Sequence, residues 1–132
     1  MSARSSRSVP VETVAQGVKT TKQVLIGPDQ GPNFALRKFC MESGGGMPLH
    51  MNSVEHEQYV LAGRARVTIG DEVLEVRAHD VVFIPAGVPH AYETLGSEPF
   101  EFLCVVPNRP DFTRLLEDPD ETGGPSPDDV PA

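Results

Sequence analysis

The sequence of 132 residues has no tryptophan, only two cysteines and 6% aromatic residues. No apolar run approaches the roughly 20 residues that a helix needs to cross a bilayer, so we expect no membrane protein. Cys40 and Cys104 are too few for a disulfide framework, and their spacing is not that of a zinc knuckle. The opening MSARSSRSVP has no apolar stretch behind its two arginines. We therefore expect no secretory signal, and a cytoplasmic protein with reduced thiols.

Basic residues are also scarce, because 11 Lys and Arg stand against 19 Asp and Glu, for a net charge of −8. This charge argues against a nucleic acid or an anionic membrane surface as the partner. Six of the 19 acids lie in residues 117–132, which contain no base and are rich in Pro and Gly. We expect a disordered N-terminus over residues 1–8, one domain over residues 9–117 and an acidic disordered tail over residues 118–132.

Turn-forming residues recur at short intervals, and short strand-like runs lie between them. The clearest pattern is a hairpin in which Ala65–Ile69 and Glu72–Val76 flank Gly70-Asp71. A helix is expected only at Arg109–Leu116, where Pro110 could occupy the first helical position. Closely spaced strands without crossover helices predict an all-β fold, an antiparallel barrel or sandwich. The other strand-like runs are Val24–Ile26, Phe34–Met41, Gln58–Leu61, Val81–Ile84, His90–Glu93 and Phe100–Val106.

Three of the four histidines fall in two short clusters. His50, Asn52 and His56 have the same parity, so their side chains would share one face of an extended strand. Two imidazoles and an amide oxygen that converge in this way indicate a metal site. His90 follows the rigid turn Pro85-Ala86-Gly87-Val88-Pro89, and a stiff turn can hold a ligand at a fixed geometry.

These clusters resemble the two motifs of the cupin family. The first motif is matched by Gly44, five residues, His50, Met51, Asn52, three residues, His56, six residues and Gly63. The second motif is matched by His79, five residues, Pro85-Ala86-Gly87, two residues, His90, three residues and Thr94. The resemblance implies a small antiparallel β-barrel of the jelly-roll type, with one cavity that holds a metal. It also implies a homodimer, which is usual among proteins that resemble this one.

The chain departs from the family pattern at four positions. Asn52 replaces the second histidine of the first motif, and His56 replaces its glutamate. His79 and Thr94 replace the glycine and the asparagine of the second motif. We expect His79 to be an exposed turn residue rather than a ligand.

Carried over by position, the resemblance implies that one divalent ion is bound by His50, His56 and His90, together with Asn52. Asn52 could coordinate weakly through its amide oxygen, contact a metal-bound water, or do neither. Imidazole ligands suit Fe, Mn, Ni, Cu and Zn alike, so the sequence does not choose the metal. The alternative is a metal-free barrel in which the histidines are relics.

A three-histidine site with an open position favours an enzyme over a closed structural site. Because no carboxylate ligand offsets the metal charge, we expect an anionic, oxygen-rich small-molecule substrate. Gln58 and Tyr92 share the parity of His56 and His90, so they could line the substrate pocket, although each could also be a packed core residue. The family hosts several reactions, of which a dioxygenase-like one is the first expectation. The alternatives are a decarboxylase, isomerase or cyclase, and a non-catalytic barrel that binds or senses a small molecule.

Overall fold

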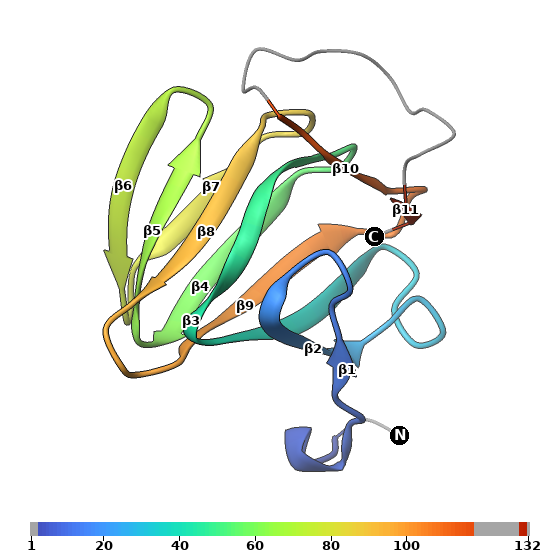
Figure 1. Cartoon of the computed structure of the whole chain (residues 1–132). Helices are drawn as coiled ribbons and strands as arrows, with labels where there is room; N and C mark the ends of the chain where they lie inside the picture. The colour runs from blue at the N-terminus through green and yellow to red at the C-terminus, as the bar shows by residue number, and fades with distance from the viewer. Residues whose placement is uncertain (1–2, 118–129, 132) are drawn as a thin grey trace.

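The computed structural model describes residues 3–117 and 130–131, and their strands form one antiparallel sheet (Figure 1). The described part of the chain contains no α-helix, only the 3-10 turn Ser6–Ser8. The all-β fold is therefore confirmed, and each predicted strand-like run lies within an observed strand. The strands are β1 (Glu12–Thr13), β2 (Val18–Ile26), β3 (Phe34–Asn52), β4 (His56–Ala62), β5 (Arg64–Ile69), β6 (Glu72–Arg77), β7 (Val81–Ile84), β8 (His90–Leu95), β9 (Phe100–Pro107), β10 (Phe112–Leu115) and β11 (Val130–Pro131).

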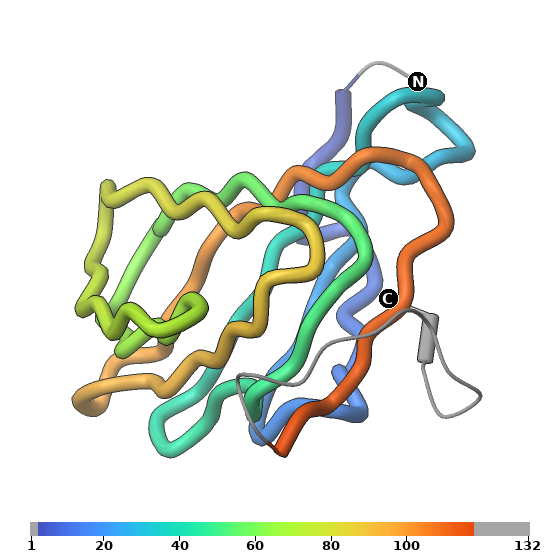
Figure 2. Tube along the Cα trace, turned by 90° about the horizontal axis from the view of Figure 1, so that it is seen from above, coloured from blue at the N-terminus to red at the C-terminus, as the bar shows by residue number. Residues whose placement is uncertain are grey.

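The sheet order is β6-β5-β8-β3-β9-β4-β7, and the sheet curls round on itself into a half-barrel (Figure 2). The long strand β3 produces much of this curl, because its first part pairs with β2 and β9 and its last part pairs with β8 and β10. Gly46 lies where the pairing changes, with φ of 154°. A Cβ atom at Gly46 would lie 2.1 Å from the carbonyl oxygen of Tyr92, so only glycine lets β3 come this close to β8.

Side chains alternate between the interior and solvent along the strands, as a period of two requires. In β9 the alternation buries Phe100, Phe102 and Cys104. In β4 the same alternation buries the polar His56 and Gln58. Burial of a polar group costs free energy unless it finds a partner, so the polar stretch of this interior is where a site is expected.

The helix expected at Arg109–Leu116 is wrong. Phe112–Leu115 instead forms β10, which pairs with the end of β3. Asp111, an acid expected near a helix N-terminus, accepts hydrogen bonds from the backbone nitrogen and the hydroxyl of Ser53, at 2.9 and 3.0 Å. Pairing with a strand distant in the sequence outweighs the weak helix preference of so short a segment.

The two ends of the chain differ in how much of them the structure describes. Within the expected disordered N-terminus, Ser6–Ser8 has a defined backbone, and Gln23 donates hydrogen bonds to the carbonyls of Ser6 and Val9 at 2.9 and 3.0 Å. Residues 118–129 of the predicted tail lie outside the described residues, whereas Val130–Pro131 pairs with β10. No helix in the described part of the chain is long and apolar enough to span a membrane.

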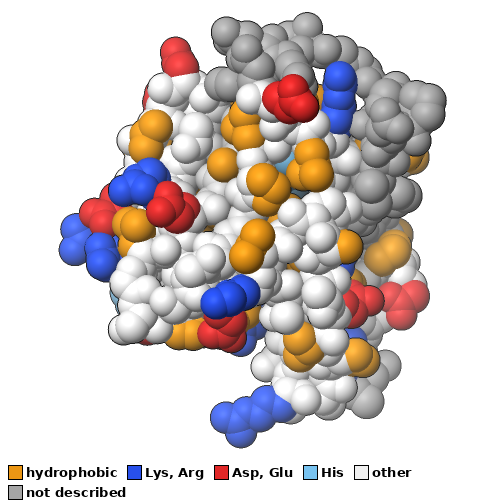
Figure 3. Space-filling model, in the orientation of Figure 1, with side chains coloured by type: hydrophobic (Ala, Val, Ile, Leu, Met, Phe, Trp, Pro, Cys, Tyr) orange, Lys and Arg blue, Asp and Glu red, His pale blue; other side chains and the backbone are white. Residues whose placement is uncertain are grey.

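The exterior carries charges of both signs side by side. Arg64 contacts Glu75 and Arg66 contacts Glu93, each at 2.7 Å, across the strands β5, β6 and β8. Figure 3 shows acidic and basic side chains next to one another on this side of the molecule. Exposed ion pairs of this kind contribute little to the stability of the fold.

Candidate metal and substrate site

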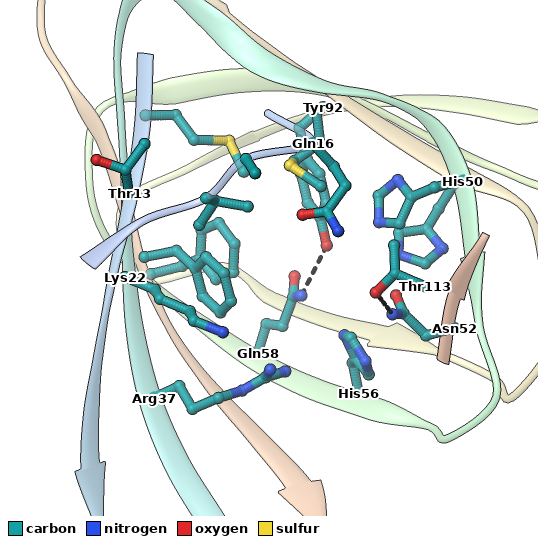
Figure 4. Close-up of a pocket in the computed structure, with 17 residues that line it drawn as sticks. Thr13, Gln16, Lys22, Arg37, His50, Asn52, His56, Gln58, Tyr92 and Thr113 are labelled. Carbon is teal, nitrogen blue, oxygen red and sulfur yellow. Dashed lines mark hydrogen bonds between the residues drawn. The ribbon is translucent and has the colours of Figure 1, made fainter. Parts of the chain in front are cut away.

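A cavity of about 240 Å³ opens inside the half-barrel. At about 30 Å³ per water, this is the volume of roughly eight water molecules, which suits a small organic molecule. Its lining comes mainly from β3, β4 and β8, with single residues from β1, β2, β9 and β10 and with residues 14–16 of the β1–β2 connection. All six residues predicted for the site line this cavity (Figure 4): His50, Asn52, His56, Gln58, His90 and Tyr92.

The three histidines reach the cavity from three different strands. His50 lies near the end of β3 and is the register partner of His90, which begins β8, while His56 begins β4. The ring centroids of His50 and His90 are 4.0 Å apart, and those of His56 and His90 are 5.9 Å apart. The expectation of one shared strand is wrong, because residues 53–55 separate β3 from β4. His50, Asn52 and His56 are nevertheless all buried and face the cavity.

Backbone carbonyls orient two of the imidazoles. Nδ1 of His50 lies 2.7 Å from the carbonyl oxygen of Pro48, and Nδ1 of His90 lies 2.9 Å from that of Val88. A carbonyl can only accept, so each Nδ1 donates its proton and each Nε2 keeps its lone pair. The Nε2 atoms of His56 and His90 are buried and have no hydrogen-bond partner among the described residues.

Burial also keeps these imidazoles neutral. Desolvation lowers the pKa of His50, and it lowers the pKa of His90 well below the usual value. Desolvation together with the positive charge of Arg37 lowers the pKa of His56 to about 3. Neutral imidazole is the form that ligates a metal, so the cluster is in the ligating state at neutral pH.

The side chain of Asn52 lines the same cavity as the three histidines. Its Nδ2 donates a hydrogen bond of 2.9 Å to the hydroxyl of Thr113 on β10. Its Oδ1 is buried without a partner. Sequence reasoning missed Thr113, because the segment that contains it carried a weak helix signal.

The unpartnered atoms on this side of the cavity fit a cation. Two imidazole nitrogens and one amide oxygen are buried with free lone pairs, and imidazole and amide groups are metal ligands. In the observed conformation, no three His, Cys, Asp or Glu side chains in residues 3–117 and 130–131 lie close enough together to bind one metal ion. The imidazoles would therefore have to turn toward a common point to hold a metal.

Gln58 and Tyr92 form a hydrogen-bonded pair in the cavity wall (Figure 4). Nε2 of Gln58 donates to the Tyr92 hydroxyl at 2.7 Å. Because the hydroxyl oxygen accepts there, its own proton can be donated elsewhere. Burial raises the pKa of Tyr92, so the hydroxyl stays protonated and can act as a hydrogen-bond donor to a ligand oxygen.

Arg37 is a cavity residue that the sequence analysis did not single out. It lies on β3, and its side chain is buried. Its Nη2 lies 3.6 Å from Sγ of Cys104, and its guanidinium carbon lies 5.1 Å from the ring centroid of Phe39. A period of two places Arg37 on one face with Ala35 and Met41, but the opposite face carries Leu36 and Cys40, so the sequence did not show which face is buried.

His79 lies away from this cluster, in an exposed turn. Its φ is 78°, a left-handed value that suits the glycine of the family motif. Its Nδ1 is 2.8 Å from the hydroxyl of Tyr59 on the outer surface. His79 is therefore a natural control for experiments on the three cavity histidines.

Comparisons with known proteins agree with this architecture. Residues 37–106 match the Cupin_2 family, the cupin domain, and the chain belongs to this family. The fold is similar to that of the polyketide cyclase RemF from Streptomyces resistomycificus, with 33% identity and a TM-score of 0.78. That match covers 90% of this chain and 89% of RemF.

Two relatives found by sequence similarity are named as enzymes of other kinds than a cyclase. The chain is 31% identical over 100 residues to 1-methylthio-D-xylulose 5-phosphate methylsulfurylase of Rhodospirillum rubrum, covering 76% of this chain and 64% of that protein. It is 33% identical over 78 residues to mannose-1-phosphate guanylyltransferase 2 of Escherichia coli O157:H7, covering 58% of this chain. The chain thus matches only 16% of the length of the guanylyltransferase.

Proposed function

We propose that this chain is a metal-dependent enzyme that activates a small, enolisable, oxygen-rich molecule. One observation carries the proposal: the buried, unpartnered Nε2 atoms of His56 and His90 and Oδ1 of Asn52, which all face one cavity. One divalent ion would be held by His50, His56 and His90, with Asn52 as a weak or water-mediated contact. Such an ion supplies Lewis-acid chemistry toward the oxygens of a substrate.

The rest of the cavity lining indicates the kind of substrate. Among the described residues no Asp or Glu lines the cavity, so no carboxylate there can act as a general base. A 1,3-dicarbonyl or phenolic molecule suits such a site, because it loses a proton readily and can bind as its enolate or phenolate. Tyr92, oriented by Gln58, would donate its hydroxyl proton in a hydrogen bond to one substrate oxygen.

Cyclisation through an enolate is the reaction that we place first. The support is the likeness to a polyketide cyclase over nearly the whole of both chains. Decarboxylation and isomerisation of an oxo acid use the same enolate. Dioxygenase-like cleavage, the first expectation from the sequence, comes second. A barrel that binds a small molecule without turnover is the alternative of a different class.

Proton exchange in a simple diketone tests the proposal without knowledge of the native substrate. Metal-free protein would be reconstituted separately with Fe, Mn, Ni, Cu and Zn under anaerobic conditions. Exchange of the central C–H protons of acetylacetone for deuterium is then followed by NMR. We expect one ion per chain, and exchange faster than with the metal-free protein. His90→Ala should lose both properties, whereas the control His79→Gly should keep them.

Each other outcome points to a different function. Oxygen consumption with cleavage of the diketone would favour the dioxygenase-like reaction. Stoichiometric metal without exchange or oxygen consumption would favour the binding barrel. Failure to take up any of the five metals would contradict the proposal.

A further inference from the structure

The cavity contains a buried positive charge that forms no ion pair with any of the described acidic residues. The Arg37 side chain is only 7% exposed and extends toward the space beside Gln58 and His56 (Figure 4). Its Nε is buried without a hydrogen-bond partner. In the part of the chain that the structure describes, no Asp or Glu forms an ion pair with it, since the observed pairs involve Lys38, Arg64 and Arg66.

The groups nearest to Arg37 do not neutralise it. Burial raises the pKa of Cys104, so the thiol that accepts from Nη2 is uncharged. Phe39 offers only the face of its ring. The charge of Arg37 does act on Asp111, but that carboxylate accepts hydrogen bonds from Ser53 and forms no ion pair with the guanidinium.

An unpaired charge in a protein interior is costly, and buried charges are therefore normally paired. No acidic side chain among the described residues lines the cavity, so none of them supplies this partner. We propose that Arg37 is the anion-binding residue of the cavity and holds the carboxylate of a small oxo acid. That the keto oxygen of this acid points toward the histidines rests on the proposed function. Binding of its carboxylate by Arg37 needs no metal.

Charge and shape favour a carboxylate as the bound group. A guanidinium presents two parallel N–H donors that match the two oxygens of a carboxylate, and the two charges cancel. A phosphate dianion would need a second cation. Lys22 is the only other Lys or Arg among the described lining residues, and it lies on the same side of the cavity as Arg37 (Figure 4), so the test below also has to distinguish a carboxylate from a phosphate held between the two. The volume of about 240 Å³ also suits a small acid.

The test compares two probes of nearly equal shape on protein kept free of metal with a chelator. Acetoacetate carries a carboxylate, and acetoacetamide is its neutral counterpart. By calorimetric titration, the wild-type protein should bind acetoacetate about 10- to 100-fold more tightly than the amide. Arg37→Met should abolish this preference.

A control variant removes a positive charge from the adjacent residue. Lys38 lies next to Arg37 on β3, but it faces outward and pairs with Glu101 at 3.4 Å. Lys38→Met should keep the preference for acetoacetate. Melting temperature adds a second readout, because loss of an unpaired buried charge should raise or preserve the melting temperature of Arg37→Met. A residue with only a structural role would lower it.

Several results would overturn the assignment. Equal affinity of the wild-type protein for the two probes would do so, as would a preference that survives in Arg37→Met. Tighter binding of inorganic phosphate than of acetoacetate, lost in Arg37→Met, would replace the carboxylate by a phosphate. If Arg37→Met fails to fold, Arg37→Lys takes its place and should weaken the preference; an unchanged preference would contradict the proposal. Because no metal is present, failure of the metal site leaves this test intact.

Discussion

The two sides of the cavity have opposite chemistry, although β3 supplies residues to both. On the histidine side, the unpartnered atoms of His56, His90 and Asn52 are neutral and carry free lone pairs. On the other side, Arg37 carries N–H donors and a positive charge that forms no ion pair with a described residue. A cation satisfies the first side and an anion satisfies the second. From this difference we expect a polar molecule to bind in the cavity in one orientation.

The curl of the sheet brings these two sides together. Arg37 belongs to the part of β3 that pairs with β9, and His50 belongs to the part that pairs with β8. Gly46, between them, allows the close approach of β3 to β8. Two residues far apart along one strand can therefore line a single small cavity.

The largest effect should come from the loss of one imidazole. His90→Ala should weaken metal binding by at least about 100-fold, since two imidazoles and an amide oxygen remain. Arg37→Met should leave metal affinity unchanged or slightly higher, because it removes a positive charge near His56. Competition with a chelator measures both. Equal losses of metal affinity in the two variants would contradict the distinction between the histidine side and the Arg37 side of the cavity.

Acid should destabilise the metal-free protein through its histidines. In the unfolded chain a histidine takes up a proton near pH 6.5, whereas in the folded protein His56 does so only near pH 3. The unfolded state therefore binds more protons below pH 6.5, and the free energy of unfolding falls as the pH is lowered toward 3. The slope is about 1.4 kcal/mol per pH unit for each such histidine.

Urea unfolding at several pH values between 7 and 4 measures this loss. Arg37→Met should make the loss smaller, because its charge lowers the pKa of His56 in the wild-type protein. A free energy of unfolding that stays constant over this range would show that the cavity histidines are not buried in the neutral form.

A smaller effect is expected from restoration of the family residue at position 52. Asn52→His should tighten binding of Ni or Zn by about tenfold, because imidazole is a better ligand for these metals than an amide oxygen. The same change would fill a position otherwise open to substrate, so the diketone exchange should slow. Unchanged metal affinity would remove Asn52 from the metal site and leave a site of three histidines.

The smallest effect is expected from truncation after Glu117. The change removes β11, but β10 keeps its pairing with β3, which positions Thr113 beside Asn52. We expect a loss of less than about 1 kcal/mol in the free energy of unfolding and no change in metal affinity. Thermal melting and metal titration of the truncated chain measure both. A larger loss would show that residues beyond 117 support the histidine side of the cavity.

Much of the architecture could be predicted because the relevant signals are local. Turn residues and a period of two placed the strands, motif spacing identified the cupin family and four residues that line the cavity, and strand parity added Gln58 and Tyr92. The helix prediction for Arg109–Leu116 was wrong because this segment pairs with a strand about 60 residues earlier in the chain. Pairing of this kind leaves no local pattern in the sequence. Thr113, the partner of Asn52, was missed for the same reason.

The fold class, the family and the shared inward face of the histidines could be predicted from the sequence, because they follow from spacing and parity along one chain. Arg37 could not be placed in this way, because apolar residues, Ala35 and Met41 on one face and Leu36 and Cys40 on the other, lie on both faces of its strand. The three-dimensional structure was needed to show that His56 is neutral and that Arg37 forms no ion pair with a described residue. Both properties depend on burial and on which groups other strands bring within a few ångströms, and no stretch of sequence contains that information.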